Sequence, residues 1–268
     1  MVITLASSLI LLLLWISPPT DGTLIGEVSE TTVLADGTAS KPINSVITAE
    51  IVTTDEESLV IESAGLYGKG DVRMVNYDTG EVLKKTPILD KYFAEGIHLT
   101  EDGVLYLLTW KERTCLAFDG ATLEERRDLN FEYKTHTGEG WGITGDGQGK
   151  LYVSDGSNFL HVWDAGTKEE IRRVEVSTSQ GRPVRFLNEL EWYRGDILAN
   201  VWYSDVIMRI DVETGIVKHI YDLKKLYPKK ERNHEADCLN GIAKMANDDL
   251  FVTGKLFDKA FRIRLDPE

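Results

Sequence analysis

A short phrase repeated four times at nearly constant spacing is the feature that most constrains the fold of this chain. The phrases begin at Glu95, Trp141, Asn188 and Asn240, so their starts lie 46, 47 and 52 residues apart. Each phrase continues with Gly or Glu and then with Ile or Leu. A period of this length indicates an array of one small supersecondary unit. The first residue of the phrase changes while the spacing is kept. We therefore expect the residues at that position to carry the function of the chain.

Two further landmarks recur with the phrase. Conspicuous side chains follow three of the phrases after 14 or 15 residues, at Trp110, Trp202 and Lys255. Acidic turns close the units and begin at Asp78, Asp119, Asp164, Asp211 and Asp266. Five turns against four phrases predict one more unit ahead of the first phrase, and a step of 46 residues back from Glu95 leads to Ala49. The sequence therefore predicts five units.

The segments between the landmarks are typical of short β-strands. Runs such as 105–108 and 151–153 are rich in aliphatic and aromatic residues and are bounded by Asp, Gly and Asn. The charged segment 223–236 accounts for the longest step and predicts a loop with a short helix. Units of about 40–50 residues with about four strands are typical of β-propeller blades. We expect an all-β, single-domain, five-bladed β-propeller over residues 44–268, in which the first strand of each blade lines a central channel.

The N-terminal segment resembles a targeting sequence. Residues 3–16 are apolar, but the stretch is shorter than the about 20 residues that span a bilayer, and no Lys or Arg precedes it. Residues 1–22 are therefore predicted to be a cleaved signal peptide, with an N-terminal membrane anchor as the alternative. The first prediction places the protein in the secretory pathway or outside the cell. Residues 23–43 are predicted to be a polar lead-in strand or tail.

Charge and composition limit the partners. The formal net charge of −14 argues against nucleic acid and against anionic membrane surfaces, because no basic stripe offsets it. We expect a monomer without stable membrane association once the leader is removed. Cys115 and Cys238 are predicted to be buried free thiols, with a disulfide as the alternative. The five His residues are scattered singly, so the sequence predicts neither a metal site nor a cofactor.

Eight motifs together resemble the plant and bacterial type of glutaminyl cyclase. In chain order they are ESAGLYG (62–68), FAEGI (93–97), EGWG (139–142), SDGS (154–157), LNELE (187–191), ANVW (199–202), LNGIA (239–243) and FVTGK (251–255). The resemblance extends from about residue 48 to the end. It implies a five-bladed propeller that converts the N-terminal glutamine of peptides or proteins into pyroglutamate, releases ammonia and uses no zinc.

This reaction requires a flexible side chain to be folded back onto its own amine. The attacking atom is the α-amine of the substrate, so no protein nucleophile is needed. Holding the reacting groups in a near-attack geometry is worth about 7–11 kcal/mol in well-oriented intramolecular reactions. Phe93, Trp110, Trp141 and Trp202 are the predicted substrate-binding residues, which position the glutamine and exclude water.

Three polar residues are the predicted catalytic group. Glu95 is expected to move a proton from the attacking amine to the departing nitrogen, because a carboxyl among aromatic side chains has a raised pKa. Asn188 and Lys255 are expected to stabilise the oxyanion of the tetrahedral intermediate. Glu189 and Glu191 either hold the phrase in place or help to bind a structural calcium ion, since members of the family can hold calcium near the channel.

The first unit departs from the family. At the channel position the family carries Phe-Thr-Gln-Gly-Leu, and this chain carries ITAEI (47–51), so Ala49 replaces the glutamine and Glu50 the glycine. The replacement leaves three hypotheses open. The chain is an active glutaminyl-peptide cyclotransferase, a propeller that binds peptide N-termini without turnover, or a purely structural propeller.

Overall fold

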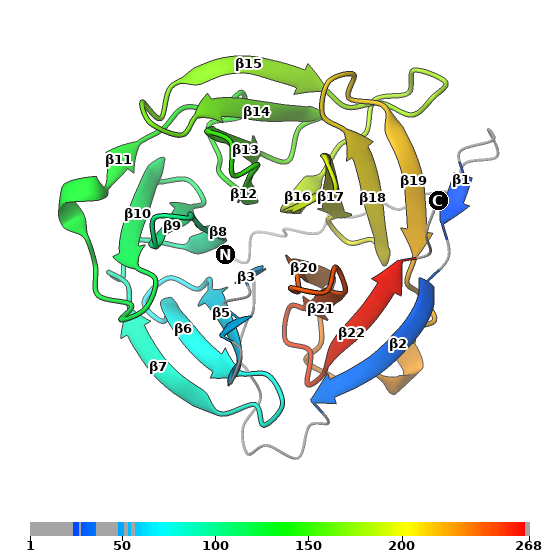
Figure 1. Ribbon diagram of the computed structural model, residues 1–268, viewed down its shortest axis with the longest axis horizontal. Coiled ribbons are helices and arrows are strands. Elements are labelled where there is room, and N and C mark those ends of the chain that lie inside the picture. Colours follow the sequence, from blue (N-terminus) through cyan, green and yellow to red (C-terminus); the bar gives the residue numbers. More distant parts are fainter. Residues whose placement is uncertain (1–23, 27, 36–47, 51–52, 55–56, 266–268) are drawn as a thin grey trace, which may run out of the picture.

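The computed structural model describes residues 24–26, 28–35, 48–50, 53–54 and 57–265. Five β-sheets are arranged in a ring around a central axis, as Figure 1 shows. Within the described residues, helix is confined to two short 3₁₀ turns, η1 (Arg127–Leu129) and η2 (Lys229–Glu231). The predicted all-β, five-bladed propeller is confirmed.

Each blade is built outward from its first strand. Blade 1 contains β3 (Thr48–Glu50), β5 (Glu57–Ala64), β6 (Asp71–Asn76) and β7 (Val82–Pro87), with β4 (Thr53–Thr54) paired to β5. Blade 2 contains β8 (Ala94–Leu99), β9 (Val104–Thr109), β10 (Thr114–Asp119) and β11 (Phe131–Glu132). Blade 3 contains β12 (Ile143–Gly145), β13 (Lys150–Ser154), β14 (Phe159–Asp164) and β15 (Glu170–Glu175).

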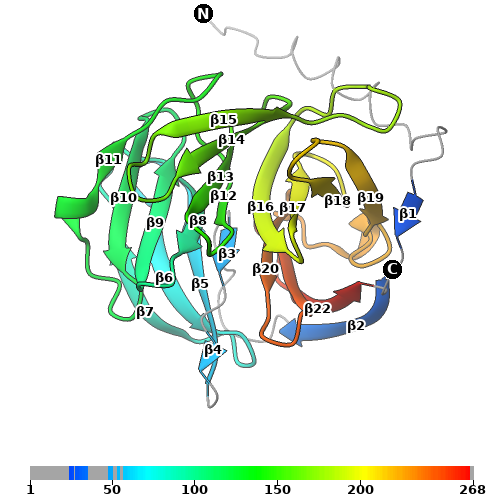
Figure 2. The same cartoon turned by 45° about the horizontal axis from the view of Figure 1, so that its top comes forward.

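The last two blades each take a strand from the N-terminal part of the chain. Blade 4 contains β16 (Leu187–Tyr193), β17 (Asp196–Val201), β18 (Val206–Asp211) and β19 (Val217–Asp222), and β1 (Leu24–Gly26) pairs in parallel with β19. Blade 5 contains β20 (Leu239–Lys244), β21 (Leu250–Gly254) and β22 (Ala260–Leu265), and β2 (Val28–Ala35) pairs antiparallel with β22. Figure 2 shows β2 along the outer side of β22.

The pairing of β2 with β22 covers the outer edge of the last sheet. An unpaired sheet edge exposes a row of backbone donors and acceptors, and closed architectures avoid it. The predicted polar lead-in, residues 23–43, thus supplies outer strands to two blades. The predicted boundaries at 22 and 43 lie outside the described residues and stay predictions.

The hydrophobic core lies between neighbouring blades. The inner strands are mostly buried, and β9 is buried along its whole length, whereas the outermost strand β7 is largely exposed. Side chains of adjacent sheets pack together in this space, for example Ile61 of blade 1 with Leu107 of blade 2. Full burial of such a side chain contributes about 1.5–3 kcal/mol. Cys115 and Cys238 are buried free thiols, as the sequence predicts.

The ring is tight at its centre, where the first strands of neighbouring blades touch. A Cβ atom on Gly96 would lie 2.5 Å from the carbonyl oxygen of Trp141, and one on Gly142 would lie 2.2 Å from that of Asn188. These positions require glycine because the backbones of adjacent blades meet there. The glycines of the repeated phrase therefore serve blade packing.

Two further sequence predictions concern the charged segment 223–236 and the N-terminal leader. The charged segment 223–236 is a loop whose short helix is η2, as predicted. None of the helices in the described part of the chain reaches the length and hydropathy of a membrane-crossing segment. The predicted leader, residues 1–22, lies outside the described residues.

Candidate active site

In blades 2, 4 and 5 the repeated phrase sits on a β-bulge at the start of the first strand. In blade 2, Ala94 pairs with Thr109 and Ile97 with Leu107, so that Glu95 and the following glycine oppose a single residue of β9. The same shift occurs in blade 4 at Asn188-Glu189 and in blade 5 at Asn240-Gly241. A bulge re-aims side chains and is often found next to active sites.

The second set of conspicuous residues also has a common backbone setting. The N–H groups of Trp110, Trp202 and Lys255 each donate to the carbonyl oxygen of the residue two positions before a phrase, at 2.9 Å. These acceptors are Phe93, Phe186 and Cys238. All three donors follow directly after the second strand of a blade, and therefore lie at the same end of the ring as the bulges.

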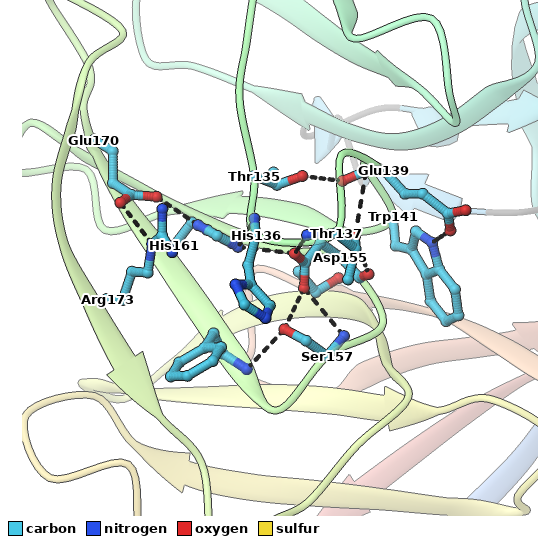
Figure 3. Close-up of polar contacts among 12 residues, drawn as sticks. Thr135, His136, Thr137, Glu139, Trp141, Asp155, Ser157, His161, Glu170 and Arg173 are labelled. Atoms are coloured by element: carbon cyan, nitrogen blue, oxygen red, sulfur yellow. Dashed lines mark hydrogen bonds and ion pairs between the residues drawn. The ribbon is translucent and has the colours of Figure 1, made fainter.

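The four predicted aromatic residues form one assembly. Phe93 packs against Trp110 with ring centroids 5.5 Å apart, and Trp141 packs edge-on against Trp202 at 5.4 Å. Glu139 joins the two pairs, because its Oε2 accepts the indole N–H of Trp110 at 2.8 Å and that of Trp141 at 2.9 Å. Figure 3 shows the contact between Glu139 and Trp141.

Two exposed tyrosines extend this assembly outward. Tyr67 packs against Phe93 with centroids 5.4 Å apart and donates to Glu112 at 2.8 Å. Tyr203 packs against Trp202 at 4.5 Å. Tyr67 and Tyr203 are 49% and 53% exposed, so the aromatic assembly continues from the buried bulges to solvent.

Glu95 is a buried carboxyl with a shifted pKa. It is 6% exposed, and burial raises its pKa to about 8. The positive charge of Lys255 opposes this shift, whereas the negative charges of Glu139 and Glu112 add to it. Desolvation of a carboxyl disfavours its charged form, which is the main cause here. The structure thus brings Glu95 and Lys255 within electrostatic reach of each other, as the predicted site requires.

Asn188 lies at the same end of the ring, linked to Trp141 through one serine. Ser154 Oγ donates to the Asn188 carbonyl at 2.6 Å and accepts the N–H of Gly142, the residue after Trp141. The side chain of Asn188 is 2% exposed, and its Oδ1 has no hydrogen-bond partner among the described residues. A buried amide whose oxygen has no partner is available to hydrogen-bond a ligand at this position. The catalytic and binding roles predicted for these residues stay predictions.

Sequence reasoning missed Glu139 and Glu112. Both lie in turns that join blades or strands, outside the repeated phrase, and their importance comes from side-chain contacts with residues of the site. The sequence signal available for Glu139 is its place two residues before Trp141 in the EGWG motif.

The residues considered for a metal do not form a cluster of ligands. Within the part of the chain that the structure describes, no three His, Cys, Asp or Glu side chains are grouped as a metal ion would require. Glu189 and Glu191 are buried on β16. Calcium binding stays one of the two alternatives for Glu189 and Glu191, beside a role in holding the phrase in place.

Comparison with known proteins gives a consistent result. Residues 43–265 match the glutamine cyclotransferase family. The chain is 36% identical over 209 residues to the glutaminyl-peptide cyclotransferase of Arabidopsis thaliana, a match that spans 77% of this chain and 63% of that relative's length. The glutaminyl cyclase of Myxococcus xanthus superimposes with a TM-score of 0.73 at 29% identity, covering 90% of this chain and 98% of that one. This chain therefore belongs to the glutamine cyclotransferase family.

Proposed function

We propose that this chain is a glutaminyl-peptide cyclotransferase that acts on peptides or proteins with N-terminal glutamine. The α-amine nitrogen attacks the carbonyl carbon of the side-chain amide, a five-membered lactam forms, and ammonia leaves. The observation that carries the proposal is the buried carboxyl of Glu95, which lies at the aromatic end of the ring and has a pKa of about 8.

The pKa of Glu95 suits the transfer of one proton between two nitrogens. A peptide α-amino group titrates near pH 7.7–8.0, close to the value for Glu95. Proton exchange between groups of matched pKa needs little driving force, and efficiency is greatest when the catalytic pKa lies near the working pH. Glu95 takes the proton from the attacking amine and then donates it to the departing amide nitrogen, so that it ends the cycle in its starting form.

Charge that develops on the amide oxygen is stabilised by Lys255 and Asn188. The Lys255 side chain already acts on Glu95 through its positive charge, and Asn188 is a buried amide at the β-bulge of blade 4. One donor aimed at an oxyanion is typically worth about 2.7–4 kcal/mol. Phe93, Trp110 and Trp141 surround the folded glutamine side chain, together with Trp202, and limit the access of water.

The experiment is an ammonia-release assay with the dipeptide Gln-Phe, with product mass as a second readout. We expect pyroglutamyl-Phe and ammonia in equal amounts, formed faster than in buffer, and no product from Asn-Phe, because the shorter side chain would have to close a four-membered ring. Binding of Gln-Phe in calorimetry without any turnover would replace the enzyme hypothesis by the peptide-binding one. Neither binding nor turnover would favour a structural propeller.

A further inference from the structure

A buried imidazole with a carboxylate on each side lies in blade 3, next to the site (Figure 3). His161 on β14 is completely buried, its Nδ1 lies 2.5 Å from Glu170 Oε2, and its Nε2 lies 3.1 Å from Asp155 Oδ2. Asp155 is 1% exposed, and Arg173 pairs with the other oxygen of Glu170 at 2.7 Å. Buried polar groups are costly unless they are paired. These side chains therefore hold one another in a single arrangement, although none of them takes part in the proposed chemistry.

Asp155 also fixes the loop that leads to Trp141. Its Oδ2 accepts the N–H of Thr137 at 2.8 Å, and its backbone carbonyl accepts the Thr137 hydroxyl at 2.9 Å. The same hydroxyl accepts the N–H of Glu139 at 3.2 Å. Thr135 adds a bond to the Glu139 carbonyl at 2.6 Å. The backbone of Glu139 is thus held from both sides.

The other end of this chain of contacts is the pair of indoles. Glu139 Oε2 accepts an N–H from Trp110 and one from Trp141, which come from different blades. The ring of Trp141 lies directly on the turn after Asp155, since a Cβ atom on Gly156 would come within 2.6 Å of its Cζ2. The turn at Gly156 therefore packs against the ring of Trp141, while Glu139 accepts the hydrogen bond from its indole N–H.

The negative charge of Glu139 affects the pKa of Glu95, so the position of Glu139 matters for that pKa. Although burial raises the pKa of Asp155, hydrogen bonds from His161, Ser157 and the loop backbone outweigh it and hold this pKa below its ordinary value, so Asp155 is an anion. The Glu139 side chain is 26% exposed, and Lys111 Nζ lies 3.7 Å from its Oε1. The groups that act on Glu95 are Lys255, which lowers its pKa, and Glu139 and Glu112, which raise it.

We propose that Glu139 is a positioning residue that holds the indoles of Trp110 and Trp141 in one arrangement. We further propose that the Asp155–His161–Glu170 group, in which Asp155 and His161 are buried, holds Glu139 in place through Thr137. The proposal rests on the proposed function for its kinetic consequences. Its geometric part concerns the two indoles and stands apart from turnover.

Thr137 offers the sharpest test, because its side chain is at the surface and its hydroxyl joins Asp155 to Glu139. Thr137→Val keeps the shape and removes two hydrogen bonds, and Thr137→Ser keeps both. We expect kcat/KM for Gln-Phe to fall about fivefold to tenfold in Thr137→Val, mainly through KM, and to stay within twofold in Thr137→Ser. Equal values for the two variants would overturn the role of Thr137.

Glu139→Gln tests the charge. The amide oxygen still accepts an indole N–H, but a negative charge near Glu95 is removed, so the acidic limb of the kcat/KM profile should move to lower pH. Glu124→Gln, the same change at an exposed position of blade 2, should leave the profile unchanged. An acidic limb that does not move in Glu139→Gln contradicts the proposal, because a residue that only supports the fold would change Tm and not this limb.

His161→Gln tests the buried end. We expect a folded His161→Gln protein to show the KM increase of Thr137→Val, and His234→Gln, at an imidazole whose side chain is 92% exposed, to behave as wild type. If His161→Gln does not fold, the two Thr137 variants decide.

Near-UV circular dichroism separates this proposal from the proposed function. If the wild-type protein does not cyclise Gln-Phe, the proposed function fails, and the indole bands are still measured. A change of these bands in Thr137→Val and Glu139→Gln, with Thr137→Ser as wild type, would support the positioning role. Unchanged bands in every variant would overturn it.

Discussion

Blades 1 and 2 begin with strands at the same position of the repeat, but the two strands pair differently. In blade 2, β8 bulges at Glu95 against β9. In blade 1, β3 pairs with β5 without a shift over its described residues, Thr48 opposite Ser63, Ala49 opposite Glu62 and Glu50 opposite Ile61. Blade 2, which carries the candidate proton shuttle Glu95, thus has one extra residue in its first strand. Blade 1, in which Ala49 stands in place of a glutamine, has no such extra residue over the described part of its first strand.

The two blades also place a buried carboxyl on different strands. Glu95 lies on the first strand of its blade, and Glu62 lies on the second, opposite Ala49. Burial raises both pKa values, to about 8 for Glu95 and to about 7 for Glu62. For Glu62 the charge of Arg73, whose Nε lies 3.8 Å away, opposes the shift, and Asp71 adds to it. Glu95 and Glu62 are thus alike in burial and in the direction of their pKa shifts. What distinguishes Glu95 is its place on a β-bulge at the end of the ring that carries the indoles.

The largest expected effect is on turnover. Glu95→Gln should lower kcat/KM for Gln-Phe by about 10²–10⁴-fold, the usual contribution of general acid–base catalysis, with Tm at pH 5 unchanged. Glu62→Gln removes the other buried carboxyl and should change kcat/KM by less than threefold. Equal losses in the two variants would mean that the comparison between the blades has no catalytic meaning.

The pH dependence of stability should reveal the same two carboxyls. A carboxyl with a raised pKa is protonated in the folded state while it is ionised in the unfolded state, so folding loses stability as pH rises from about 4.5 to the folded pKa. The Tm of Glu95→Gln should therefore exceed that of wild type by an amount that grows with pH up to about pH 8. For Glu62→Gln the difference should grow up to about pH 7. We expect gains of at least about 2–4 °C, which corresponds to about 1 kcal/mol in a domain of this size. Scanning calorimetry between pH 5 and 9 measures both curves, and differences that do not vary with pH would contradict the raised values.

The smallest effect is expected from restoring the family pattern in blade 1. The double variant Ala49→Gln, Glu50→Gly adds one amide at the channel position and should raise kcat/KM by at most about tenfold, the value of one or two hydrogen bonds. Glu50→Gly alone serves as its control. A double variant slower than wild type would indicate that blade 1 has been rebuilt around Ala49.

The long period made the fold predictable. A unit of constant length with strand-forming residues between polar turns has few solutions, and the glycines at 96 and 142 keep their places because neighbouring backbones meet there. Two aromatic residues of the candidate site could be singled out for the same reason. Trp110 and Trp202 follow their phrases by 15 and 14 residues and make the same backbone hydrogen bond in different blades.

Side-chain contacts, both within a blade and between blades, were not predictable from the period. Glu139 acts through indoles of two blades, and His161, in the sequence one of several isolated histidines, is paired with carboxylates on both sides. Such pairs depend on side-chain directions that a single sequence does not specify. The bulges were hidden as well, because a strand with one extra residue keeps the same composition.

The pairing of β2 with β22 has a consequence for the order of events during synthesis. These strands lie at opposite ends of the described chain, so the ring closes only after the last strand has left the ribosome. Contacts of such high sequence separation are entropically costly and form slowly. Until then the outer edge of blade 5 is open to pairing with other chains. We therefore expect a requirement for chaperones, or a risk of aggregation, to be greatest just before β22 is released.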